Sequence, residues 1–137
     1  MVKWPLRVLG YLWTSPNTLI GLAFALAAGG RARIFHGVLE VHGPGVRWLL
    51  ARMTPAGSTV QAFALGHVVL GRDPDALNRT RAHEAVHVRQ YERWGPLFLP
   101  AYILASLLTA LRGRDPYLDN PFERAALAAE SQSERSV

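Results

Sequence analysis

The run His83-Glu84-Ala85-Val86-His87 constrains this chain more than any other feature, because its spacing has a chemical meaning only on a helix. Residues four apart lie one turn above each other on a helix, so both imidazoles can offer a ring nitrogen to one metal ion. Glu84 lies beside them, where it can hold and deprotonate water at the metal. The alternative is a pair of exposed histidines that bind nothing.

A catalytic zinc site needs a third protein ligand and an open fourth position. The chain contains no cysteine, so this ligand must be a histidine or a carboxylate. Gln90 and Arg93 stand where a metzincin would have glycine and histidine, which excludes that subclass. The residues that remain open as third ligand are His36, His42, His67, Glu92, Asp115, Asp119, Glu123 and Glu130.

Among these candidates, geometry favours Glu123 as the third metal ligand. If an apolar helix over 97–111 folds back antiparallel on the motif helix, the loop to Asn120 is long enough to return the chain to the histidines. Glu123 also stands three residues after Asn120, as in a capping box, so a purely structural role is the alternative. Glu130 is the reserve candidate.

Hydropathy patterning predicts a single α+β domain over 1–137 with helices at both ends. Residues 1–30 are expected to form an apolar N-terminal helical segment, with Ser15 as N-cap and Pro16 as first helical residue. A secretory signal peptide, with the small residues 25–27 as cleavage site, is the alternative for this end. Residues 79–131 are expected to form the metal-binding region, with helices over 80–94, 97–111 and 121–131 capped by Asn78 or Thr80 at the start and by Asn120 at the last helix.

Residues 31–71 between these ends have the composition of β-strands. Three strands are expected over 33–43, 46–50 and 58–71, joined by turns at 43–45 and 55–58 that contain glycine and proline. Hairpin connections of this kind predict a small antiparallel sheet. His36 and His42 would then lie on one face of a strand, where a second metal site is conceivable, although exposed histidines without metal are the more common case.

Charge and hydropathy favour a membrane surface over nucleic acid as partner. Half of the residues are hydrophobic and the formal net charge is +5, almost all of it from arginine. The arginines are spread along the chain and form no stripe, so we expect no nucleic-acid binding. Lys3 and Arg7 alternate with aromatic residues in a pattern suited to a membrane interface. So short a chain with so much apolar surface also favours a homodimer.

The chain resembles a gluzincin-type zinc metallopeptidase of minimal size, through His83, Glu84, His87 and a downstream Glu123 in Asn-Pro-Phe-Glu-Arg-Ala-Ala. It is also similar to small bacterial membrane-associated proteins of the H-E-x-x-H type, through Ser-Pro-Asn-Thr-Leu-Ile-Gly near the N-terminus and His-Val-Arg-Gln-Tyr after the motif. The first resemblance covers about residues 60–130. Together they imply a zincin-like domain at the bacterial inner membrane, with its sidedness open.

The gluzincin resemblance implies that His83, His87 and Glu123 ligate zinc. It implies that Glu84 is the general base, which activates water for hydrolysis of a peptide bond and passes the proton to the leaving amine. The segment 61–70 would be the strand that binds an extended peptide or protein substrate by β-augmentation.

Two features depart from the gluzincin pattern. Leu127 stands where many gluzincins have an aspartate that orients a ligand histidine. No motif marks the residue that stabilises the oxyanion, for which His67, Tyr91 and Tyr117 are the candidates. The rival functions are a membrane-associated structural or interaction protein that binds zinc without turnover, and a basic scaffold for anionic lipid or nucleic acid.

Overall fold

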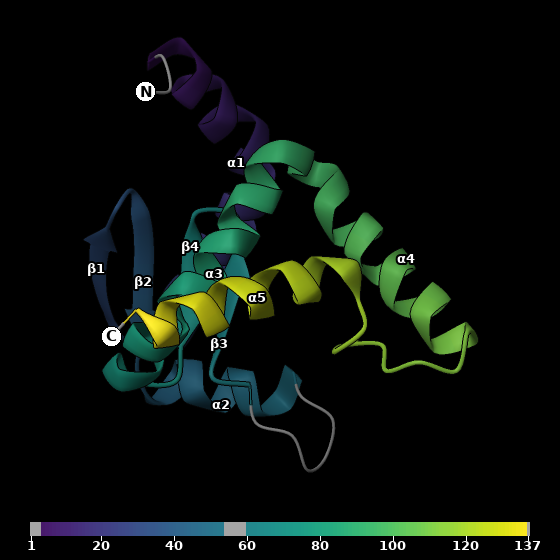
Figure 1. Cartoon of the computed structure of the whole chain (residues 1–137). Helices are drawn as coiled ribbons and strands as arrows, with labels where there is room; N and C mark the ends of the chain where they lie inside the picture. The colour runs from purple at the N-terminus through teal and green to yellow at the C-terminus, as the bar shows by residue number, and fades with distance from the viewer. Residues whose placement is uncertain (1–3, 54–59, 137) are drawn as a thin grey trace.

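The computed structural model describes residues 4–53 and 60–136, and their helices surround one small sheet (Figure 1). The α+β class expected from the sequence is confirmed. In chain order the elements are α1 (Trp4–Ala28), β1 (Arg31–Phe35), β2 (Val38–His42), α2 (Pro44–Met53), β3 (Ala62–Leu65), β4 (Val68–Gly71), α3 (Pro74–Trp94), the 3-10 turn η1 (Gly95–Leu97), α4 (Phe98–Leu111) and α5 (Pro121–Arg135).

The sheet has four strands in the order β1-β2-β4-β3. Two antiparallel hairpins, β1–β2 and β3–β4, meet along a parallel pair in which Val41 lies opposite Leu70. The sheet is therefore mixed, and the expectation of a purely antiparallel sheet was wrong at this pair. The cause is α2, which carries the chain across before the second hairpin begins, so that β4 enters alongside β2 in the same direction.

The segment expected as a strand over 46–50 lies in α2. Pro44 takes the first turn of this helix, and the turn of the first hairpin lies instead at His36 and Gly37, with φ of 50° and 79°. Val46 and Leu50 are buried four residues apart, which is the spacing of one helix face. The turn expected at 55–58 lies outside the described residues.

The core lies on both faces of the sheet. Along β4, Val69 packs on one face against α3, while Val68 and Leu70 pack on the other face against α2. Each fully buried aliphatic side chain of this kind contributes about 1.5–3 kcal/mol. Helix α3, which carries the H-E-x-x-H motif, therefore packs against the sheet through only one of its sides.

Helix α1 is continuous from Trp4 to Ala28 and runs through Pro16, where the sequence pattern predicted a start. Proline has no N–H to donate to the carbonyl of Leu12, and the hydroxyl of Ser15 donates to that carbonyl instead over 2.7 Å. The second half of α1 is anchored by its small and polar face. Asn17 donates from Nδ2 to the carbonyl of Gly95 over 2.9 Å.

Helix α3 begins at Pro74, six residues before the expected start at 80, because Asp73 caps it by accepting from the backbone amide of Ala76 over 2.7 Å. It ends at Trp94, as expected. Helix α5 begins at Pro121 with Asn120 as cap, also as expected, and extends to Arg135. It lies across α3, on the side away from the sheet (Figure 1).

Helix α4 leaves α3 at η1 and splays away from it, so the expected antiparallel packing of the two helices was wrong (Figure 1). Only Phe98 and Thr109 of α4 are buried. Its exposed leucines include Leu107 at 57% and Leu111 at 83%. The loop after α4 returns along it, since Asn120 Nδ2 donates to Ser106 Oγ over 2.8 Å.

Residues Pro74–Leu111 form one continuous helical stretch with an 18-residue window of mean hydropathy 1.6, and 17% of that window is buried. By length and composition this is the one helix within the described ranges that is able to cross a membrane. The core helix of a soluble protein passes the same test, but most of such a helix is buried.

Candidate metal centre

Three side chains from α3 and α5 converge on one point. His83 Nε2 lies 3.1 Å from Glu123 Oε2, His87 Nε2 lies 3.3 Å from Glu123 Oε1, and the two Nε2 atoms lie 3.3 Å apart. All three residues are buried. The structure thus unites the two motif histidines with the favoured third ligand in a group that can hold a metal ion.

The spacing and chemistry of these atoms fit a metal. Ligand atoms about 2.0–2.1 Å from a tetrahedral zinc ion lie about 3.3–3.4 Å from one another, close to the separations of 3.1 and 3.3 Å found here. Two imidazoles and one carboxylate are also a donor set of catalytic zinc sites. Within 4–53 and 60–136, no other three histidine or acidic residues come close enough to share an ion.

The second ring nitrogen of each histidine is also engaged. Glu130 Oε2 lies 3.0 Å from His83 Nδ1. Because a carboxylate only accepts, His83 donates through Nδ1, and in the neutral ring this leaves the lone pair on Nε2 for a metal. Glu130, the reserve ligand, therefore lies behind His83, on the far side of the ring from the cluster, and supplies a carboxylate in the absence of an aspartate at position 127.

His87 is oriented by its neighbour one turn on. Gln90 Nε2 donates to the carbonyl of Phe122 over 3.1 Å, so its oxygen faces His87 Nδ1 at 2.9 Å. His87 therefore also donates through Nδ1 and offers Nε2 to the cluster. In the sequence, Gln90 excludes the metzincin pattern, and its spacing of three residues from His87 is the signal that places both residues on one helix face.

Glu123 is held as an anion. Burial alone would raise its pKa, but hydrogen bonds from His83 and His87 outweigh burial and hold the pKa well below its ordinary range. Tyr102 also donates to Glu123 Oε1 over 2.7 Å. Burial and this hydrogen bond raise the pKa of Tyr102, so its hydroxyl keeps its proton. No local sequence signal marked Tyr102, which reaches the site from α4.

Without an ion, the histidines compensate the carboxylates by binding protons. Burial disfavours the charged form of His83, but the hydrogen bond to Glu123 and the charge of Glu84 outweigh burial and raise the pKa to about 9. The pKa of His87 is also raised, because the hydrogen bond to Glu123 and the charge of Glu84 outweigh the effect of burial. At neutral pH a metal ion therefore displaces protons from the cluster.

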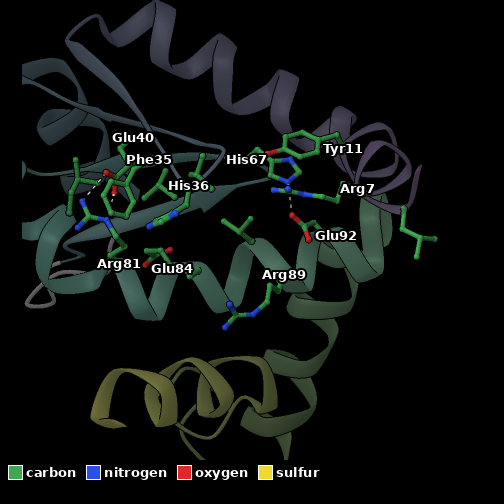
Figure 2. Close-up of a pocket in the computed structure, with 17 residues that line it drawn as sticks. Arg7, Tyr11, Phe35, His36, Glu40, His67, Arg81, Glu84, Arg89 and Glu92 are labelled. Atoms are coloured by element: carbon green, nitrogen blue, oxygen red, sulfur yellow. Dashed lines mark hydrogen bonds and ion pairs between the residues drawn. The ribbon is translucent and has the colours of Figure 1, made fainter. Parts of the chain in front are cut away.

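Glu84 is buried, with 5% exposed, and its Oε2 has no hydrogen-bond partner among the described residues. Burial raises the pKa of its carboxyl group, while the two neighbouring histidines oppose this effect. Figure 2 shows Glu84 on the side of α3 that faces the sheet, at the edge of a pocket. Glu84 thus borders that pocket and has one buried oxygen without a hydrogen-bond partner among the described residues.

Comparison with known proteins assigns no family to this chain. Family models, curated proteins and solved structures give no match. The resemblance to gluzincins therefore stays a prediction.

The three oxyanion candidates lie in different places. Tyr117 lies near the cluster, since burial and the charge of Glu123 raise its pKa. Tyr91 is buried in the core and donates to the carbonyl of Ala64 over 2.9 Å. His67 is stacked on Tyr11, and its Nε2 lies 2.8 Å from Glu92 Oε1. Both His67 and Glu92 thus lie outside the ligand group.

The remaining candidate ligands have structural surroundings. Asp115 accepts from the backbone amides of Tyr117 and Leu118, and Asp119 accepts from the amide of Asp115, so both shape the loop before α5. His36 lies in the hairpin turn and His42 at the far end of β2. The second metal site considered for these two histidines is therefore not formed.

The segment 61–70, expected to bind substrate as a strand, contains two strands. β3 forms an edge of the sheet, whereas β4 lies between β2 and β3. Only β3 is therefore placed to accept a further strand at its outer side.

Proposed function

We propose that this chain is a zinc-dependent metallopeptidase of minimal size. The observation that supports this most is the meeting of His83 Nε2, His87 Nε2 and Glu123 in one buried group, beside a glutamate whose oxygen has no partner. His83, His87 and Glu123 would give the ion three ligands and leave a fourth coordination position for substrate or water.

Each residue has a part in this reaction. A zinc ion polarises the carbonyl under attack and lowers the pKa of water. Glu84 would accept the proton of the attacking water and then donate it to the leaving amine, and its raised pKa makes its carboxylate a stronger base in the first step. Glu130 and Gln90 keep Nε2 of each ligand histidine directed at the cluster.

Metal analysis tests the site directly. We expect about one zinc per chain in the purified wild type, strong loss in H83A and E123A, and retention in E84Q with loss of peptide hydrolysis. Glu134→Ala, at an exposed acidic residue near the end of α5, is the matched control and should keep its zinc. Purified wild-type protein that contains no metal would contradict the proposal.

A second candidate function is zinc binding without turnover. It is favoured by one observation: His83, His87 and Glu123 do not line the pocket that Glu84 borders, so the ligand atoms are screened from it. Zinc retained in wild type and in E84Q, without hydrolysis of any peptide in a mixed peptide library, would favour this alternative.

We also propose that the protein is associated with a bacterial inner membrane. The support is the exposure of apolar side chains on two helices, with Trp4 at 77% and Leu12 at 63% on α1 and Leu104 at 57% on α4. Large apolar surfaces exposed on soluble proteins mark sites that interact with proteins or membranes. Flotation with liposomes tests this localisation, and a protein that stays unbound and soluble without detergent would contradict it.

A further inference from the structure

Helix α4 has two unlike sides. On its inner side Phe98 and Thr109 are buried, and Tyr102 donates to Glu123 over 2.7 Å. Its outer side carries a row of exposed apolar side chains: Ile103, Leu104, Leu107, Leu108 and Leu111. Their alternating spacing of one and three residues places them on one helix face, opposite Phe98, Tyr102 and Thr109. We call this row the outer face of α4.

The first half of α1 is exposed in the same way. No residue from 4 to 13 is buried, and more than half of the surface is exposed at Trp4, Leu9 and Leu12. Asn17 then anchors the helix to the carbonyl of Gly95 in η1, the turn from which α4 leaves. Figure 1 shows the first half of α1 and α4 along one side of the molecule, with the sheet, α2 and α5 on the other side. Residues 4–13 and the outer face of α4 together form what we call the apolar edge.

The charges that flank the apolar edge are positive. Four exposed arginines lie there: Arg7 on α1, Arg93 before α4, and Arg112 and Arg114 after it. None of their side chains is paired with a carboxylate of the described residues. The sequence has no acidic residue before Glu40 and none between Arg93 and Arg114. Apolar surface combined with uncompensated positive charge fits the acyl chains and phosphates of an anionic lipid.

A second copy of the chain fits the apolar edge less well. In a two-fold dimer the same surface meets itself, so the cations of one copy meet the cations of the other. The stretch from Arg93 to Arg114 contains no carboxylate to compensate them, and like charges brought together in an interface are costly. A lipid surface supplies the missing negative charge.

The length of α4 limits how it can enter a bilayer. Its 14 residues extend about 21 Å, short of the hydrocarbon core of about 30 Å. Arginines stand just before and just after it, and each is costly in hydrocarbon. Helix α3 cannot extend the span, since it packs against the sheet on one side and against α5 on the other. An orientation in the plane of the interface satisfies both the leucines and the arginines.

We propose that the apolar edge docks on one leaflet of an anionic phospholipid bilayer, with α4 in the plane of the interface and lipid phosphates on Arg93, Arg112 and Arg114. The proposal rests on the membrane association inferred above, and it adds the charge of the lipid and the depth of the helix. Because Tyr102 reaches Glu123 from the inner side of α4, docking would hold the metal cluster close to the membrane surface.

Vesicle composition tests the charge of the lipid. Purified wild-type protein is mixed with vesicles of phosphatidylcholine alone or of phosphatidylcholine with phosphatidylglycerol, and sedimentation measures the bound fraction. We expect about 100-fold tighter binding to the anionic vesicles, since each of three arginines contributes about fivefold near such a surface. Equal binding to both would keep the membrane association and overturn the proposal, whereas binding to neither would overturn both.

Arginine variants locate the lipid phosphates. Arg112→Gln combined with Arg114→Gln should reduce the preference for anionic vesicles about 25-fold. Arg47→Gln combined with Arg135→Gln is the matched control, because it removes the same charge from α2 and from the end of α5, away from the apolar edge (Figure 1). The control should bind as the wild type does. Equal losses in the two double variants, or no loss in the first, would overturn the assignment.

Single cysteines measure the depth of α4, because the chain has no cysteine of its own. Leu104→Cys and Leu111→Cys place a bimane label at points about 10 Å apart along the helix axis. If α4 lies in the plane, lipids brominated at one acyl position should quench both labels to the same degree. Glu134→Cys, at the exposed end of α5, is the control and should not be quenched. Strongly unequal quenching at the two α4 positions, or quenching at neither, would overturn the proposal.

The same labelled protein without vesicles tests for a second copy on the apolar edge. Sedimentation velocity should show a monomer, and the label at Leu104→Cys should emit as a fluorophore in water. A dimer with blue-shifted emission at this position would identify a second copy as the occupant and overturn the proposal.

Discussion

Nε2 of His83 and Nε2 of His87 lie 3.3 Å apart, although the rings belong to successive turns of α3. Two things hold them there: Glu130 and Gln90 engage the Nδ1 atoms, and Glu123 faces both Nε2 atoms. The rings are thus oriented before any ion arrives. Orientation of this kind lowers the cost of binding, because fewer rotamers are lost when the metal enters.

Zinc affinity should fall as pH falls below about 9. In the metal-free protein the pKa of His83 is raised to about 9 and that of His87 is also raised, while the pKa of Glu123 is lowered. Protons therefore compete for both imidazoles at neutral pH, whereas the carboxylate stays ionised. Calorimetry of zinc binding at pH 7 in buffers of different ionisation enthalpy should show release of about one to two protons. If zinc binding released no protons, the raised pKa values of His83 and His87 would be contradicted.

The metal-free protein should lose stability as pH rises from about 6.5 to beyond 9. The folded-state pKa of His83 lies above the unfolded value, so the stabilisation is fully present below about 6.5 and is lost as pH passes the folded value. We expect a loss of roughly 1–3 kcal/mol in the free energy of unfolding. Chemical denaturation in the presence of a chelator measures it. With zinc bound the loss should disappear, since the ring is then neutral throughout.

Glu130→Ala should weaken zinc binding by about 10- to 100-fold, because His83 loses the carboxylate that orients its ring. Competition with a fluorescent chelator measures the affinity. Glu134→Ala removes a carboxylate from the exposed end of the same helix and should leave the affinity unchanged. If both variants bound zinc as the wild type does, the contact between Glu130 and His83 would have no role in metal binding.

Tyr102→Phe should destabilise the metal-free protein by about 1 kcal/mol. The substitution leaves the ring in place and removes the hydroxyl that donates to Glu123 over 2.7 Å. Tyr117→Phe is the comparison, because the hydroxyl of Tyr117 also bonds to Glu123 but belongs to a ring that is 47% exposed, so water replaces part of the lost bond. The expected order of midpoint temperatures is wild type, then Tyr117→Phe, then Tyr102→Phe several degrees below wild type. An unchanged midpoint for Tyr102→Phe would show that its hydrogen bond contributes nothing net.

Lysine substitutions on α4 should abolish liposome binding without loss of metal. Leu104 and Leu107 are each 57% exposed, so their replacement costs little of the folding free energy but is costly in lipid. Flotation assays and metal analysis of Leu104→Lys with Leu107→Lys measure the two properties separately. Unchanged flotation of this double variant would contradict a membrane role for α4.

Local patterns in the sequence were sufficient for much of the helical part. The spacing of His83 and His87, the break at Gly95-Pro96 and the cap at Asn120 each depend on residues within one or two turns, and the structure has all three where they were expected. Local patterns failed over 46–50, where a short apolar run fits a strand or a helix equally well. Its identity as α2 depends on burial of Val46 and Leu50 under the sheet.

By itself, the sequence determined that two histidines share a helix face, that Glu84 lies beside them and that no cysteine can complete a site. Only the tertiary structure decided which carboxylate faces the Nε2 atoms and which lies behind the ring of His83. Glu123 and Glu130 are 40 and 47 residues from His83, and their placement depends on where α4 and its loop deliver α5. The parallel pairing of β2 with β4 and the pocket beside Glu84 were also decided by the tertiary structure. Contacts between distant segments depend on how the whole chain packs, and no local spacing encodes them.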